Sequence, residues 1–275
     1  MTGSLAARVG TAAVLLPPVL AVVLLAGPLA FAVALGAFLL LAGWEWLRLS
    51  SLRSRPLRLL WLAALALLAA ASHRLLPPAA QEGLVLAGAV FWVATLLWLR
   101  HPGFAAGPGL AGCLLKAASG SFALLVAWLA LVLLRERLGG PAWVLYLLGL
   151  VWAADIGAFF AGRALGGARL APRISPGKTW AGFLGGMGAA LLLAALSGPL
   201  VFALEGRALA GFLGVSLLSA LASVIGDLFE SLIKRQVAEK DSGRLLPGHG
   251  GMSDRVDSLL AAAPVFTGGL IWLAR

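Results

Sequence analysis

The chain has 275 residues, of which 61% are hydrophobic and only 12% charged, and it carries a formal net charge of +10 with a mean hydropathy of +0.99. Soluble domains carry about 25% charged residues, so this composition excludes an ordinary soluble fold. The single cysteine, Cys113, excludes an intrachain disulfide and a cysteine-based metal site.

Nine apolar runs approach the roughly 20 residues that a helix needs to cross a bilayer. We therefore predict an all-α polytopic membrane protein, with about nine transmembrane helices in one integral membrane domain over residues 1–275. The third and fifth runs are short for a full crossing and favour tilted or partly re-entrant helices. The predicted spans are 11–27, 28–47, 57–72, 83–99, 118–134, 142–161, 181–203, 209–231 and 258–274.

The basic residues predict which side of the membrane each loop faces. With the N-terminus inside the cell, sixteen of the 21 Lys and Arg residues fall in cytoplasmic loops, as the positive-inside rule requires. This predicts an N-in/C-out topology and a cytoplasmic polar stretch at 231–257. The basic residues are spread over several short loops, which indicates contact with anionic membrane lipids and no nucleic-acid partner.

The first polar element in chain order is Asp155, in the sixth predicted span. An ionised Asp near the bilayer centre costs about 2.5 to 3.5 kcal/mol on insertion scales, so we expect a cavity, a cation or the protein interior beside it. A structural ion pair between helices is the alternative interpretation.

The second element is the loop 174–180, which contains Ser175, Lys178 and Thr179. Its Gly-Lys-Thr sequence resembles the end of a P-loop, but Pro172 stands where a P-loop needs glycine, and no buried strand precedes it. What remains is a basic, hydroxyl-bearing loop at a helix N-terminus, where free amides and the helix dipole favour phosphate. A basic loop that only contacts the membrane surface is the alternative.

The third element begins on the eighth span, where Asp227, Glu230, Ser231 and Lys234 follow i, i+3, i+4, i+7 spacing and share one helical face. The Gly- and Pro-rich stretch 243–251 then ends the helix and allows backbone amides to approach a ligand.

Beyond that stretch, Ser253 is expected to N-cap the ninth helix and to place Asp254 and Asp257 on one face of its first turns. Two acidic helix ends would then converge on one basic loop. His249 is a phosphate donor or a hydrogen-bonded loop residue in this interpretation, with proton abstraction as the less favoured alternative.

Clustered carboxylates beside clustered cations are typical of phosphoryl or nucleotidyl transfer, in which acids hold Mg2+ and Lys or Arg neutralise phosphate. The stretch 231–257 resembles the C-terminal motif of the phosphatidate cytidylyltransferases, also called CDP-diacylglycerol synthases. The region around Asp155 and the 175–179 loop are also similar to that family, so the likeness runs from residue 155 to the end of the chain. Ala181 departs from the family pattern at an often polar position. The motif residues are Ser231, Lys234, Arg235, Lys240, Asp241, Gly243, Pro247, His249, Gly250, Gly251, Asp254, Arg255 and Asp257.

The resemblance implies a reaction of CTP with phosphatidate that gives CDP-diacylglycerol and pyrophosphate. It implies a divalent cation, normally Mg2+, with a second cation left open. Residues 1–140 would form the N-terminal helices and 141–275 the catalytic helices. High Ala, Leu, Gly and Arg content fits a multi-pass protein of the bacterial inner membrane, and the many small residues favour a homodimer through helix packing.

The resemblance also implies three groups of site residues. The expected catalytic residues are Asp227, Asp254, Lys240 and Asp155. The expected metal ligands are Asp227, Asp254 and Asp257. The expected substrate-binding residues are Ser175, Lys178, Thr179, Ser231, Lys234, Arg235, His249, Gly250, Gly251 and Arg255. For each basic residue, the alternative role is an ordinary salt bridge or helix cap.

Two rival functions remain open from the sequence. One is another lipid enzyme, either a CTP-dependent polyprenol kinase or a CDP-alcohol phosphotransferase, although the sequence at 155–158 does not reproduce the latter's Asp-Gly and Ala-Arg motif. The other is an ion-coupled transporter that uses Asp155 and Asp227, which would be expected to place them near the midplane of an internally repeated fold.

Overall fold

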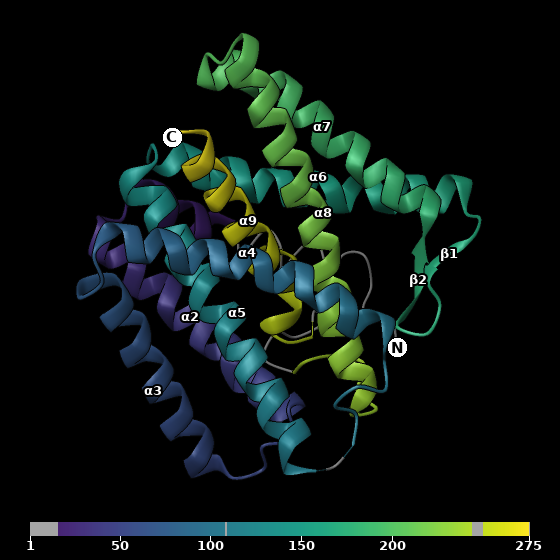
Figure 1. Ribbon diagram of the computed structural model, residues 1–275. Helices are drawn as coiled ribbons and strands as arrows, with labels where there is room; N and C mark the ends of the chain where they lie inside the picture. Colours follow the sequence, from purple (N-terminus) through teal and green to yellow (C-terminus); the bar gives the residue numbers. More distant parts are fainter. Residues whose placement is uncertain (1–15, 108, 244–249, 275) are drawn as a thin grey trace.

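The computed structural model describes residues 16–107, 109–243 and 250–274. These residues form a helical bundle with one small hairpin at its margin (Figure 1). The helices are Leu16–Leu25, α2 (Pro28–Leu49), α3 (Arg55–Arg74), α4 (Pro78–Arg100), α5 (Leu110–Arg137), α6 (Pro141–Leu165), α7 (Trp180–Phe202), α8 (Gly206–Gln236) and α9 (Asp257–Leu273). The strands β1 (Arg169–Ala171) and β2 (Ser175–Thr179) pair antiparallel, and a 3-10 turn, η1, covers Ser253–Arg255.

Where the residues are described, the predicted spans coincide with helices, and seven of these helices, α2 to α8, are long and apolar enough to cross a membrane. The chain is therefore a multi-pass helical membrane protein. The expectation of short third and fifth spans is wrong, because α3 has 20 residues and α5 has 28. Both helices run past the predicted ends, since α3 begins at Arg55 and α5 extends from Leu110 to Arg137. The shorter apolar helices are α9 and the described part of the first, Leu16–Leu25.

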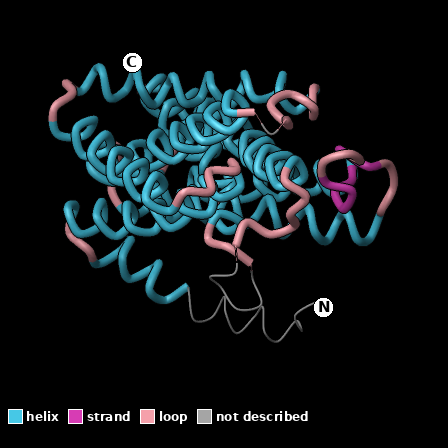
Figure 2. Tube along the Cα trace, turned by 90° about the horizontal axis from the view of Figure 1, so that it is seen from below, coloured by secondary structure: helices cyan, strands magenta, loops and turns pink. Residues whose placement is uncertain are grey.

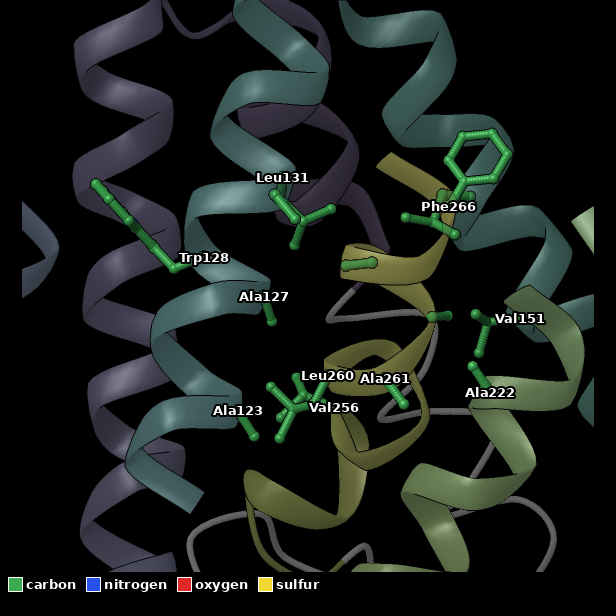
Figure 3. Close-up of a cluster of buried hydrophobic side chains, with 14 of the residues drawn as sticks. Ala123, Ala127, Trp128, Leu131, Val151, Ala222, Val256, Leu260, Ala261 and Phe266 are labelled. Carbon is green, nitrogen blue, oxygen red and sulfur yellow. The ribbon is translucent and has the colours of Figure 1, made fainter. Parts of the chain in front are cut away.

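The last helix, α9, lies in the middle of the bundle and contacts α4, α5, α6 and α8. In Figure 3, Leu260 and Ala261 lie between the side chains of α5 and Ala222 of α8, and Phe266 lies further along α9. Ala261 and Phe266 are completely buried. Small residues let membrane helices approach closely, so this packing fixes the N-terminal end of α9, which carries Asp257.

Helices α6 and α7 pack side by side through small residues. A Cβ at Gly186 would lie 2.7 Å from the carbonyl oxygen of Ala154, and one at Gly182 would lie 2.9 Å from that of Ala158. The β1–β2 hairpin joins these helices and projects from the edge of the bundle (Figure 2). The sequence predicted only a loop there, because strands this short show no periodic pattern.

Candidate active site

The first ion pair of the site joins the hairpin to α8. Lys178 on β2 places its Nζ 2.5 Å from Oδ2 of Asp227, and each side chain is 27% exposed. One turn further along α8, the hydroxyl of Ser231 donates to Oδ1 of Asp227 at 3.3 Å. Arg235 donates through Nε to the carbonyl of Ile174 in the hairpin. The hairpin that contains Lys178 therefore contacts the acidic face of α8 at two points.

A second and more buried network surrounds Lys234, near the C-terminal end of α8. Its Nζ lies 2.6 Å from Oδ1 of Asp254 and 3.4 Å from Oε1 of Glu230. The Glu230 side chain is 1% exposed, and its Oε2 accepts a hydrogen bond from the hydroxyl of Ser253 at 2.8 Å. The buried carboxyl group of Glu230 and the partly buried one of Asp254 thus share one ammonium group, which ties η1 to α8.

The carboxylate of Asp254 has several donors. Besides Lys234 on Oδ1, the backbone N–H groups of Ser242 and Gly251 donate to Oδ2 at 2.9 and 2.8 Å. Burial raises the pKa of Asp254, but the Lys234 ammonium and the backbone hydrogen bonds outweigh burial, so this pKa lies below its ordinary value of 3.8. Asp254 is therefore ionised at neutral pH and draws Ser242 and Gly251 together.

Asp257 links the two networks. It begins α9, its Oδ1 accepts from the N–H of Ser258 at 2.6 Å, and its carboxyl group interacts electrostatically with both Asp227 and Lys234. Gly226 permits this approach of α8 to α9, because a Cβ on Gly226 would overlap the backbone carbonyl of Asp257. The carboxyl groups of Asp227 and Asp257 consequently face the same region.

Asp155 is the contribution of α6 to the site. Its side chain is exposed on the helix surface and interacts electrostatically with Asp227, Lys178 and Arg255. The close packing of α6 on α7 positions it there. All three polar elements predicted from the sequence therefore lie together at one end of the bundle.

The acidic residues supply only part of a metal site by themselves. Within the described ranges, no group of three or more His, Cys, Asp and Glu side chains has the arrangement of a metal site. Mg2+, however, commonly uses one or two protein carboxylates and completes its shell with water and substrate phosphate oxygens. Asp227 and Asp257 fit that donor set. Metal ligation by Asp254 stays a prediction, and Lys234 would compete for its Oδ1.

The hairpin residues predicted to bind substrate differ in their surroundings. Thr179 is buried, and its hydroxyl accepts from the N–H of Gly182 at 3.0 Å, so it caps α7. Ser175 begins β2 and is half-buried. Of the predicted hairpin residues, Lys178 is the one whose charged group reaches α8.

The predicted residues after α8 differ in their exposure. Lys240 and Arg255 are exposed. Gly250 has φ +83°, a left-handed conformation that favours glycine, and the amide of Gly251 is engaged by the Asp254 carboxylate. His249 lies outside the described residues.

The expected capping role of Ser253 is wrong. Helix α9 begins at Asp257, and Ser253 instead begins the turn η1. The hydroxyl of Ser253 donates to Glu230, and its backbone N–H donates to Glu45 at 2.9 Å. Both donors of Ser253 are therefore hydrogen-bonded to buried carboxyl groups. The turn η1 places Asp254 before the first turn of α9.

Two residues of α2 that the sequence analysis missed also reach this site. Glu45 is 3% exposed and bonds to Ser253, while Arg48 donates to the carbonyl of Ser242 at 2.6 Å. One signal was present in the sequence: Glu45 is the single acidic residue in the apolar run 28–47. A carboxyl group in such a run needs a polar partner.

Comparison with known proteins finds similarity along nearly the whole chain. The model of the cytidylyltransferase family matches residues 6–270. The chain is 41% identical over 268 residues to the phosphatidate cytidylyltransferase of Pseudomonas aeruginosa, with 97% of each chain covered. It is 39% identical over 290 residues to the phosphatidate cytidylyltransferase of Haemophilus influenzae, with 94% of this chain and 96% of that one covered. The similarity thus extends well beyond residues 155–275 and includes α2.

Proposed function

We propose that this chain, which belongs to the cytidylyltransferase family, transfers the cytidylyl group of CTP to phosphatidate and releases pyrophosphate. The observation that carries the proposal is the alternation of acidic and basic groups from Lys178 and Asp227 to Lys234 and Asp254, at one end of a bundle of membrane-spanning helices. Such a site suits a soluble triphosphate and a lipid phosphate that meet at the membrane surface.

The positive-inside rule supports a cytoplasmic site. Sixteen of the 21 Lys and Arg residues fall on the proposed cytoplasmic side, together with the C-terminal end of α8 and the hairpin. CTP is available in the cytoplasm, and the bacterial relatives support the inner membrane as the location. The small residues on the helices also support a homodimer, which the mass of the protein–detergent complex would test.

The reaction needs no covalent enzyme intermediate. A phosphate oxygen of phosphatidate attacks the α-phosphorus of CTP, the new P–O bond forms, and the bond to the β-phosphate breaks as pyrophosphate leaves. The two substrates repel each other, so the protein must hold both and offset their charge. Lys178, Arg235 and Lys240 are the proposed phosphate contacts, and the bond from Arg235 to Ile174 keeps the hairpin against α8.

Asp227 and Asp257 would hold a divalent cation, which when bound supplies positive charge to phosphate oxygens. The ammonium group of Lys178 forms an ion pair with the carboxylate of Asp227 in this structure. Lys178 would therefore turn from the carboxylate toward a phosphate when substrate and cation are present. Asp254 would keep Lys234 and the backbone of Ser242 and Gly251 in place.

The function is tested with purified protein in detergent, CTP labelled in the cytidine and phosphatidate. Labelled CDP-diacylglycerol and pyrophosphate should form in equal amounts, and only when both substrates and Mg2+ are present. Formation of a phosphorylated lipid with release of CDP would instead indicate a CTP-dependent kinase. No turnover of CTP in protein that retains its fold would reject the proposal.

Lys240→Ala should have a modest effect. Lys240 is exposed, and no ion pair is recorded for it in the described part of the chain. Loss of one of several phosphate contacts should raise the KM for CTP by about fivefold and leave kcat within about twofold. Steady-state kinetics with Arg53→Ala, another exposed basic residue, provide the control. A fall in kcat of about 100-fold would show that Lys240 acts on the transition state.

A further inference from the structure

The buried carboxyl group of Glu45 contacts both ends of the polar stretch that follows α8. Its Oε2 accepts from the backbone N–H of Ser253 at 2.9 Å and lies 3.0 Å from the hydroxyl of Ser242. That hydroxyl is also 2.9 Å from Oδ2 of Asp254, so it bridges the two carboxyl groups. A single hydroxyl group thus connects the carboxyl group of Glu45 to that of Asp254.

Two glycines of the polar stretch lie directly against this carboxyl group. A Cβ on Gly243 would overlap Oε1 of Glu45, and a Cβ on Gly251 would overlap Oε2. Oε1 is buried, and the described residues offer it no hydrogen-bond partner. The glycines of this stretch were expected to let backbone amides approach a ligand, and in this structure Gly243 and Gly251 allow the close approach of a side chain of α2.

Arg48, one helical turn after Glu45, holds the same stretch from its outer side. It donates to the carbonyl of Ser242 at 2.6 Å and forms a 3.2 Å ion pair with Glu239. Glu45, Arg48, Glu239 and Gly243 contribute to the lining of a cavity of about 440 Å3 between α2 and the stretch. Contacts on two sides leave little freedom for the backbone around Ser242.

We propose that Glu45 and Arg48, here named the α2 clamp, are positioning residues for the reaction and act by holding residues 239–243 and 251–254 in the geometry that orients Asp254. The proposal rests on the proposed function for its catalytic consequence. It assigns an active-site role to the N-terminal helices. Neither residue needs to touch a substrate.

Glu45→Gln is the main test, because it preserves the size of the side chain. The amide NH2 group would replace either Oε1, which lies against Gly243, or Oε2, which accepts from the N–H of Ser253. Misplacement of a group that orients the site should lower kcat by about tenfold and leave both KM values within about threefold. The loosened stretch should also be cut faster by trypsin after Lys240, which mass spectrometry of the full-length protein in detergent would measure.

Arg48→Ala provides a second variant that does not disturb the core, since Arg48 is 41% exposed. It should lower kcat and speed cleavage after Lys240, both by less than Glu45→Gln does. Arg53→Ala should match the parent in kcat and in cleavage rate. If Glu45→Gln does not fold, Arg48→Ala decides the question.

Parent-like kcat and cleavage rates in both clamp variants would overturn the proposal, and so would a rise in KM with kcat unchanged. If the parent itself transfers no cytidylyl group, the proposed function fails, and the cleavage rates alone decide whether the clamp exists.

Discussion

Asp227→Asn should reduce cytidylyl transfer by about three orders of magnitude while the protein keeps its fold. The substitution preserves the shape of the side chain and removes the negative charge that Lys178 now faces at 2.5 Å and that a divalent cation would share with Asp257. The side chain is 27% exposed, so the loss of the ion pair costs little stability. The measurement is the rate of CDP-diacylglycerol formation as a function of Mg2+ concentration.

The residual activity of this variant should require more Mg2+ than the parent does, because one of two carboxylate ligands is gone. Glu205→Gln is the matched control, since Glu205 is exposed beside the opposite end of α8. Activity within a few-fold of the parent, at ordinary Mg2+ concentration, would remove Asp227 from the site and leave Asp257 without its proposed partner.

The helical part of the fold was predictable because each span is a long apolar run. The ends of the helices were not, since Arg55 and Arg135 extend α3 and α5 beyond the hydrophobic part. The β1–β2 hairpin was missed because its strands have three and five residues, and the second contains Pro176 and Gly177. Hydropathy reports where a chain meets lipid, and it contains little information about short polar structure at the surface.

The residues of the site on α8 were predictable from local spacing, and those on other elements were not. Helical periodicity placed Asp227 and Lys234 on one face, and each of them forms an ion pair with a residue outside α8. Glu45 and Arg48 come from 190 or more positions earlier than their partners, Glu239 and Ser253 among them. Nothing in the local pattern of α2 indicates which distant backbone its carboxyl group will meet.

The role of Ser253 shows how tertiary contacts override a local signal. A serine before an acidic residue is a common helix N-cap, but the buried carboxyl groups of Glu230 and Glu45 compete for its hydroxyl and its N–H. An unpartnered buried carboxyl group is more costly than an uncapped helix end. Residues Ser253–Arg255 therefore form the turn η1, and α9 begins after it, at Asp257.

Asp254→Asn should reduce turnover by about 100-fold and also destabilise the protein, which distinguishes Asp254 from Asp227. The amide has only one acceptor oxygen, whereas the carboxylate now accepts from Lys234 on one oxygen and from Ser242 and Gly251 on the other. Leaving the buried Lys234 without its closest partner should cost about 3 kcal/mol. Added Mg2+ should not restore activity, and trypsin should cut the stretch after Lys240 faster, as in the Glu45 variant.

The pH dependence of stability provides an independent check on Asp254. The pKa of Asp254 in the folded protein lies below its ordinary value of 3.8, so its stabilising contribution is complete above that value and is lost as the pH falls through the lower, folded-state pKa. The difference in thermal midpoint between the parent and Asp254→Asn should therefore be constant from pH 7 to pH 5 and should shrink as the pH approaches 3. A difference that grows on acidification would mean that Asp254 is not held as a carboxylate by Lys234. In that case the second network would not orient the site through this ion pair, and the α2 clamp would have nothing to position.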